Sequence, residues 1–351
     1  MSFQLKPSAV HTLIGIGVGI VLFLLTFGVE QYYRFHVSNL RSNDGKEHTY
    51  NIYPGTSVDS VLNMLRKDYT ISGELDLRWH MRLMVFTRPE PGHYAFPAEM
   101  GDKEFINRLK LGEQTPVLIK WNNTCRTREE LAGKVTSRLM MDSVSLLRLL
   151  EDDAFLKQYG FDRETSRCLF IPNTYEVYWT ITPDALFARM QREYNAFWNQ
   201  ERRQKAEEIG LNPIEVSILA SIVESETYNS KDMPTIASLY LNRLRLGMPL
   251  QACPTVKYAV GDFTLRRILN KHLAVESPFN TYLHTGLPPA PICLPSKETI
   301  KAVVFAPQTD FLYFCASPTL DGTHRFAATL AEHNRNAAAY HAALNRQGIK
   351  R

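Results

Sequence analysis

Hydrophobic and polar positions divide the chain into an N-terminal apolar run, a short polar segment and a long remainder of mixed character. Leu13 to Val29 reads LIGIGVGIVLFLLTFGV and contains no charged residue. A run of this length predicts a helix at the short end of what crosses a bilayer. No second apolar run of spanning length follows, so we expect the rest of the chain to be soluble.

The apolar run has two interpretations. A cleaved secretory signal peptide is similarly apolar, but it ends in a small-x-small cleavage site, and here EQYY follows at Glu30 to Tyr33. The two tyrosines suit a membrane–water interface. The sequence therefore predicts a tail at 1–12, an uncleaved anchor at 13–33 and a polar linker at 34–46. Basic residues lie on both sides of the anchor, so the positive-inside rule gives no orientation.

Residues 47–114 predict a small module with the order strand–helix–helix–strand. The alternating segment at His48 to Tyr53 is typical of a strand. Thr56 or Ser57 is a suitable cap for the helix that follows, and a further helix is expected at Asp102 to Leu111. The module is therefore of the α+β class.

From residue 115 the pattern changes twice more. Pro116 to Trp121 (PVLIKW) predicts a strand, and helices are expected after it, so 115–165 is interpreted as a connecting subdomain. From residue 166 onward, aromatic residues, Pro and Asn become frequent between the predicted elements. We interpret 166–351 as a separate domain of mixed α/β character, which makes the whole chain α+β.

Composition narrows the choice of function only slightly. Of the 351 residues, 44% are hydrophobic and 22% are charged, an ordinary globular balance. The net charge of +4 is too small to indicate a nucleic-acid partner. None of the five cysteines lies in a CxxC pair or in a Cys/His cluster with zinc spacing, so no metal or cofactor is predicted. Disulfide pairing among them is left open.

The strongest chemical candidate lies in LNPIEVSILASIVESET, Leu211 to Thr227. Asn212 is a good N-cap, and Pro213 fits the first turn of a helix. An apolar stripe follows at helical spacing, and Glu226 falls on the same face at the C-terminal end. The stripe consists of Val216, Leu219, Ile222 and Val223.

Two effects act on Glu226 in the same direction. Partial burial disfavours a charged carboxylate, and so does the negative end of the helix dipole. Both raise the pKa of Glu226, and a carboxyl that is protonated near neutral pH is suited to general acid catalysis. Glu224 is two residues away and points to another side. The alternative is that Glu226 only caps the helix or forms a salt bridge.

Ordered motifs extend this observation. ASIVESET at 220–227 resembles the ASIxExET signature of the MltG/YceG family, whose second Glu is the catalytic acid, and the resemblance assigns that role to Glu226. IASLYLNRLRLGMPLQ at 236–251 is similar to the family's VASVxxNRLxxGMxLQ, and PTVKY at 254–258 matches its PTVxY. SPFNTYLHTGLPP at 277–289 is similar to SPYNTYxxxGLPP. Such collinear matches are very unlikely by chance.

The chain departs from the family pattern at several positions. Cys253 and Asn173 each stand where the family usually has Asp. Phe279 replaces the first Tyr of YNTY, and Ala290 replaces the Gly after LPP. These changes leave Glu226 intact, but they put in doubt any mechanism in which one of those Asp residues acts directly.

The resemblance implies an enzyme and its setting. The expected reaction is endolytic cleavage of the β-1,4 bond between MurNAc and GlcNAc in peptidoglycan, leaving a 1,6-anhydroMurNAc end and requiring no cofactor. It further implies that 47–114 is a LysM-like module and that 166–351 is the catalytic domain. The protein is then expected in the bacterial inner membrane as a single-pass protein with its catalytic domain on the periplasmic side. It would end the growth of nascent strands, with cell-wall synthases as possible partners.

Side chains of several kinds are candidates for binding the glycan. Amides donate to and accept from sugar hydroxyls, and tyrosine rings offer flat apolar faces to a pyranose. The alternative for each is that it only fixes a loop by local hydrogen bonds. The predicted substrate-binding set is Glu224, Asn242, Arg243, Gln251, Thr255, Tyr258, Asn280 and Tyr282.

Two other functions remain open at this stage. A muramidase that uses water would need a second carboxylate, for which Glu224 and Asp232 are candidates. A non-catalytic peptidoglycan-binding scaffold is the other, and Cys253 and Asn173 are its best support.

Overall fold

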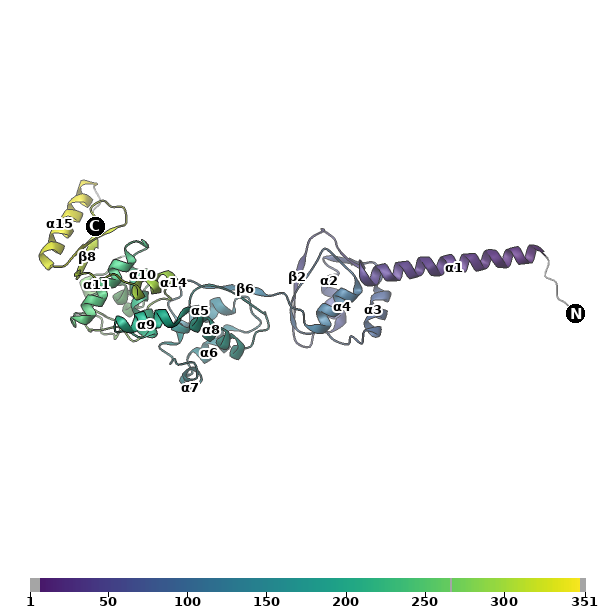
Figure 1. The fold of residues 1–351 in the computed structure, drawn as a ribbon, viewed down its shortest axis with the longest axis horizontal. Helices are drawn as coiled ribbons and strands as arrows, with labels where there is room; N and C mark the ends of the chain where they lie inside the picture. Colours follow the sequence, from purple (N-terminus) through teal and green to yellow (C-terminus); the bar gives the residue numbers. More distant parts are fainter. Residues whose placement is uncertain (1–6, 266, 348–351) are drawn as a thin grey trace. The chain divides into compact units, whose positions relative to one another are not determined.

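A computed structural model describes residues 7–265 and 267–347, drawn as a ribbon in Figure 1. The chain divides into two compact units, and each is described by itself. Unit 1 runs up to Val117 and also contains Glu176–Thr180, whereas unit 2 contains Leu118–Tyr175 and continues from Ile181. The segments interpreted as a connecting subdomain and a catalytic domain therefore lie mostly within one compact unit.

Unit 1 begins with the helix α1 (Pro7–His36). Within Val10 to His36, a window of 18 residues has a mean hydropathy of 2.4, and no residue of that window is buried in the protein. Among the described residues α1 is the one helix that is long and apolar enough to cross a membrane. Its end packs against α3 (Glu74–Leu83) and α4 (Asp102–Leu111).

Two small antiparallel sheets make the body of unit 1. β2 (His48–Ile52) pairs with β4 (Gly92–Phe96), and α2 (Val58–Leu65) and α3 lie between them in sequence. β1 (Leu40–Ser42) is the centre of the second sheet, between β3 (Tyr69–Ile71) and β5 (Glu99–Met100).

The segment 34–46 is more ordered than the predicted linker. It contains the end of α1 and the strand β1, and the side chains of Asn39 and Leu40 are fully buried. Its polar sequence is misleading because Asn39 makes its hydrogen bonds inside the unit, to Gly73 and Asp102. The core of unit 1 lies around Leu62, Leu65, Phe96 and Phe105.

Unit 2 is rich in helices. Outside the two sheets of unit 1, short strands pair at two places. β6 (Val117–Lys120) pairs with β7 (Thr174–Val177), and β8 (Tyr313–Ala316) pairs with β9 (His324–Ala327). The remaining elements are α5 (Arg128–Thr136), α6 (Ser143–Leu150), α7 (Asp153–Lys157), the 3₁₀ turn η1 (Ser166–Leu169), α8 (Pro183–Phe197), α9 (Gln200–Glu208), α10 (Pro213–Glu226), α11 (Met233–Arg245), α12 (Cys253–Val260), α13 (Asn270–Leu273), α14 (Lys297–Val304) and α15 (Leu330–Arg346).

The helix α10 lies at the centre of unit 2. Asn212 caps its N-terminus and forms a capping box with Glu215, as the sequence leads us to expect for the Asn-Pro start. Every residue from Val216 to Val223 is buried, against α11, α12 and α14. The predicted one-sided apolar stripe is therefore too narrow, since serine and alanine on the other faces are also enclosed. A helix fixed on all sides holds its last residue in a defined place.

Candidate active site

Glu226 is the last residue of α10, because Thr227 has an extended backbone and ends the helix. Its Oε1 accepts a hydrogen bond of 2.7 Å from the hydroxyl of Tyr240 on α11. Burial raises the pKa of Glu226 to about 7, while the bond from Tyr240 acts in the opposite direction. The predicted rise of this pKa agrees with the structure, with burial as its leading cause.

Tyr240 occupies one of the two oxygens of Glu226. The side chain of Tyr240 is buried, and burial together with the nearby carboxyl raises its own pKa well above 10. It therefore remains a donor to Oε1 in both states of Glu226. No hydrogen bond to Oε2 is found among the described residues, so Oε2 is the oxygen left open to a substrate. Sequence reasoning missed Tyr240, since the contact joins two helices and no local spacing encodes it.

Two clefts meet at Glu226. The first has a volume of about 420 Å³, and the second about 400 Å³. Both are lined by Glu226 and Cys253, so the carboxyl lies where the two hollows adjoin. The first is also lined by Arg126, Glu224, Tyr228, Lys257, Tyr258 and Phe263, and the second by Tyr240, Arg243, Gln251, Tyr282, Tyr313 and His333.

Glu224 lines the first cleft but is engaged with the protein. Its carboxylate accepts from Asn123 Nδ2 at 2.8 Å, from Ser296 Oγ at 2.9 Å and from the hydroxyl of Thr299. Ser296 is the N-cap of α14. Glu224 therefore joins α10 to the start of α14, and its oxygens are already supplied with donors.

Asp232 is similarly occupied. Its Oδ2 accepts from the backbone N–H of His324 at 3.0 Å and lies 2.8 Å from Nδ1 of the same histidine. Neither of the two carboxylates considered for a water-using muramidase is thus left without partners.

Three of the predicted substrate-binding residues lie outside the residues that line the two clefts. Asn242 Nδ2 donates to the carbonyl of Thr309 at 2.6 Å, and Asn280 Nδ2 donates to the carbonyl of Val275 at 2.8 Å. Thr255 is fully buried and donates to the carbonyl of Ala252 at 2.7 Å. These side chains hold loops around the site.

Arg243, Gln251 and Tyr282 line the second cleft, and Tyr258 lines the first. Arg243 is buried and donates to the carbonyls of Leu312 at 2.7 Å and Leu250 at 2.9 Å, so it holds the cleft wall.

Gln251 has a φ of 52°, in the left-handed region that side chains other than glycine rarely adopt. Its backbone N–H donates to the carbonyl of Thr281 at 3.0 Å, which fixes the strained residue beside Glu226.

Cys253 lines both clefts where they adjoin, at the position where the family resemblance leads us to expect Asp. Its Sγ lies 3.3 Å from the hydroxyl of Tyr282, and desolvation raises the pKa of the thiol. The group therefore stays neutral, and it adds no negative charge beside Glu226. Within the described parts of the chain, no group of three or more His, Cys, Asp and Glu side chains is arranged to hold a metal ion.

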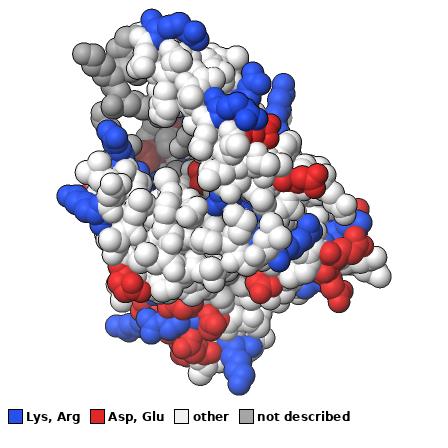
Figure 2. Space-filling view, turned by 90° about the vertical axis from the view of Figure 1, so that its left-hand side faces the viewer, with Lys and Arg blue, Asp and Glu red and all other residues white. Residues whose placement is uncertain are grey.

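Charges of both signs are mixed at the surface. Figure 2 shows a face on which Lys and Arg are interspersed with Asp and Glu around a broad uncharged area. This face has no field of one sign that would select a highly charged ligand. In the first cleft, Arg126 stacks on the ring of Phe263 at 4.8 Å, and Tyr258 packs on Phe279 at 4.7 Å. Ring faces and hydrogen-bonding groups thus dominate this wall.

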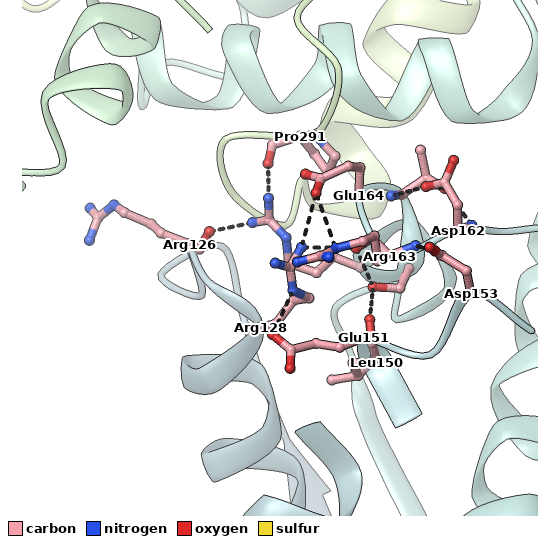
Figure 3. Close-up of polar contacts among 12 residues, drawn as sticks. Arg126, Arg128, Leu150, Glu151, Asp153, Asp162, Arg163, Glu164 and Pro291 are labelled. Atoms are coloured by element: carbon pink, nitrogen blue, oxygen red, sulfur yellow. Dashed lines mark hydrogen bonds and ion pairs between the residues drawn. The ribbon is translucent and has the colours of Figure 1, made fainter. Parts of the chain in front are cut away.

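Arg167 on η1 holds the floor of the first cleft together. It is buried, and its guanidinium donates to the carbonyls of Arg126 and Pro291, both labelled in Figure 3. It also donates to the hydroxyl of Tyr258 at 3.1 Å. Arg128 belongs to the same neighbourhood, where it donates to the carbonyl of Arg163 at 2.9 Å. Residues before position 170 therefore contribute to the site, although the sequence motifs that predicted the site all lie after position 210.

Comparisons with known proteins agree with one another. The model of the YceG-like family matches residues 50–339. A Bacillus subtilis protein named endolytic murein transglycosylase is 26% identical over 311 residues, which cover 84% of this chain and 85% of that protein. A Streptococcus pneumoniae protein of the same name is 25% identical over 360 residues; the alignment covers 92% of this chain but 64% of the longer relative.

A solved structure supports the fold. The crystal structure of a YceG-like protein from Listeria monocytogenes is similar to this chain with a TM-score of 0.54 and 23% sequence identity. The match covers 83% of this chain and 98% of that one. The mixed α/β architecture is thus shared with a solved member of that group.

Proposed function

Because this chain belongs to the YceG-like family, we propose that it is an endolytic murein transglycosylase, the activity for which its Bacillus and Streptococcus relatives are named. The observation that carries the proposal is Glu226, a carboxyl with a pKa raised to about 7 at the meeting point of two clefts. Such a group is protonated in a large fraction of molecules near neutral pH and is able to act as both acid and base.

The reaction needs this one group. Glu226 donates its proton from Oε2 to the glycosidic oxygen as the bond from that oxygen to C1 of MurNAc breaks. The carboxylate then accepts the proton of the 6-hydroxyl of the same sugar, whose oxygen bonds to C1 and forms the 1,6-anhydro ring. The carboxyl is restored, and no water is consumed. The hydrogen bond from Tyr240 to Oε1 holds the carboxyl in one orientation through both steps.

The two clefts support cleavage within a strand. An endolytic enzyme binds sugars on both sides of the bond that it cuts, and Glu226 and Cys253 line both hollows. We place the ring faces of Tyr258 and Tyr282 beside sugar units on opposite sides of Glu226.

The engaged carboxylates favour this reaction over hydrolysis. A muramidase that uses water needs a second acidic group. Glu224 and Asp232 are held by Ser296 and His324, respectively, and neither is free to activate water without losing those bonds. A non-catalytic scaffold is less well supported, because the raised pKa of Glu226 has no use in a protein that only binds glycan.

We also propose the setting of the enzyme. α1 serves as a single-pass anchor in the inner membrane, and unit 2 acts on the periplasmic side. Residues 47–114 of unit 1 serve as a LysM-like module that contacts glycan. Cell-wall synthases are the expected partners, because an enzyme that ends nascent strands must act where they are made; crosslinking in cells that recovers no synthase would contradict this.

The test is digestion of purified peptidoglycan strands by the full chain, with the products read by mass spectrometry. We expect 1,6-anhydroMurNAc ends from the wild type and none from Glu226→Gln. Cys253→Ser is the matched control, since it replaces a neighbouring side chain of the same clefts and should keep the anhydro products. Reducing ends from the wild type would establish a hydrolase instead. No cleavage by a folded wild type would support the scaffold.

A further inference from the structure

We propose that α3 lies on the surface of the membrane that α1 crosses, with its exposed apolar stripe among the lipid headgroups. The inference rests on the proposed anchor. Leu75, Trp79 and Leu83 are 84%, 53% and 60% exposed. They are spaced four residues apart and therefore share one face of α3.

The fold of unit 1 does not need this stripe. The opposite face of α3 supplies Leu77 and Met81 to the core, so the helix is already packed without the exposed residues. Val85 extends the apolar edge just beyond the helix and is 73% exposed. Its φ of 50° is a rare conformation for a β-branched residue, which marks this exposed edge as a strained feature that the surrounding structure maintains.

The end of α1 is fixed to α3. Arg34 of α1 forms an ion pair with Asp76 of α3, and the ring of Phe35 lies 4.7 Å from that of His80. α3 accordingly lies beside the end of α1 in Figure 1. A Cβ on Gly101 would lie 2.6 Å from the backbone oxygen of Phe35, so α1 also sits directly on the start of α4.

This junction sets the depth of α3 relative to a bilayer. Val29 is the last residue of the uncharged apolar run, and Arg34 follows five residues later. At 1.5 Å per helical residue, the contact with Asp76 lies about 7 Å beyond the apolar run along the axis of α1. That distance falls within the headgroup region, where Trp side chains are enriched.

Charge points to lipid in preference to a protein partner. Arg82 and Arg88 lie near the end of the stripe in sequence, both are exposed, and no ion pair of either is found among the described residues. The acidic residues at the start of α3, Glu74 and Asp76, are paired with arginines. An exposed Trp between leucines with basic residues beside it is the composition of a helix that lies in an anionic membrane surface. The stripe therefore contacts the bilayer itself.

The test uses the fluorescence of Trp79 in the full chain. The chain has four tryptophans, and Trp121, Trp179 and Trp198 are buried. After reconstitution into vesicles of phosphatidylglycerol and brominated phosphatidylcholine, we expect the bromine to remove most of the Trp79 emission. The Trp79→Phe chain supplies the signal of the other three and should lose the bromine-dependent part.

Two further variants make the result specific. Leu75→Ser combined with Leu83→Ser should restore most of the Trp79 emission, whereas Leu246→Ser, at a leucine in unit 2 that is 63% exposed, should not. Flotation of the vesicles tests the membrane anchor separately from the position of α3. A chain that floats while Trp79 emits as in water overturns the inference and leaves the anchor intact. A chain that does not float overturns both.

Discussion

Glu226 makes the stability of the protein depend on pH. Its pKa rises from an ordinary 4.5 to about 7 on folding. The folded state therefore binds this proton more tightly than the unfolded chain, and its contribution to the free energy of unfolding falls as pH rises from 4.5 to about 7. At 1.36 kcal/mol per pKa unit the full effect is roughly 3 kcal/mol.

Glu226→Gln is consequently expected to be more stable than the wild type at pH 8, by up to about 3 kcal/mol, with little difference at pH 4. Urea unfolding of both chains at the two pH values measures this. Because both chains contain the same other titratable groups, the contributions of those groups to the pH dependence cancel in the difference. An equal difference at both pH values would show that Glu226 is not buried as an ionisable carboxyl.

Tyr240→Phe tests the group that orients Glu226. Removing the hydroxyl removes a bond that lowers the pKa of Glu226, so that pKa should rise by about one to two units, because a hydrogen bond to a charged group contributes about 1.5–3 kcal/mol. The loss of kcat/KM at high pH should shift upward by the same amount, and the maximal rate should fall. A fall in rate without a shift of the pH profile would assign Tyr240 to packing alone.

At the scale of the element, both ends of α10 are fixed by side-chain hydrogen bonds. The capping box of Asn212 begins it, and Glu224 near its end holds the N-cap of α14 through Ser296. Glu224→Gln keeps the shape but replaces an acceptor by a donor, so we expect a loss of roughly 1–3 kcal/mol of stability. Thermal unfolding measures it. The products of Glu224→Gln should still carry anhydro ends. If the wild type instead gives reducing ends and this variant does not, Glu224 acts as the second carboxylate of a muramidase.

Arg167→Met tests the hydrogen bonds that connect η1 to the residues of the first cleft. The variant leaves the carbonyls of Arg126 and Pro291 without their buried donor, which should cost about 3 kcal/mol or more. KM for glycan strands should also rise, because Tyr258 loses its partner. Denaturant unfolding and initial rates measure the two effects. Arg163→Met is the control, since Arg163 has an exposed side chain in the same neighbourhood.

Sequence reasoning was strongest where the information is local. Asn212 and Pro213 predicted the start of α10, and the position of Glu226 after the apolar run predicted its raised pKa. It was weakest where a contact joins distant segments. The bond from Tyr240 and the partners of Glu224 depend on how helices pack, and the amides of Asn242 and Asn280 look the same in sequence whether they bind sugar or a loop carbonyl.

At the scale of the whole molecule, the clefts at Glu226 and the candidate membrane anchor belong to different units. All residues that line the two clefts belong to unit 2, and the one candidate span among the described residues belongs to unit 1. The collinear motifs that indicate the family lie along unit 2. The strand β1 within 34–46 could not be predicted from the sequence, because this polar segment has no apolar pattern. The anchor is therefore expected to affect where the enzyme works rather than its chemistry.

Removing residues 1–29 tests this division. The truncation keeps Arg34 and Phe35, which hold the start of unit 1 to Asp76 and His80. On soluble strands the shortened chain should match the full chain. On strands attached to lipid in vesicles it should be slower by about 100-fold, because the anchor no longer raises the effective concentration of enzyme at the membrane. Rates of anhydro-end formation on the two substrates measure the ratio. An equal loss on both would mean that α1 supports the fold of the enzyme, and equal rates on both would mean that the span has no part in directing it to nascent strands.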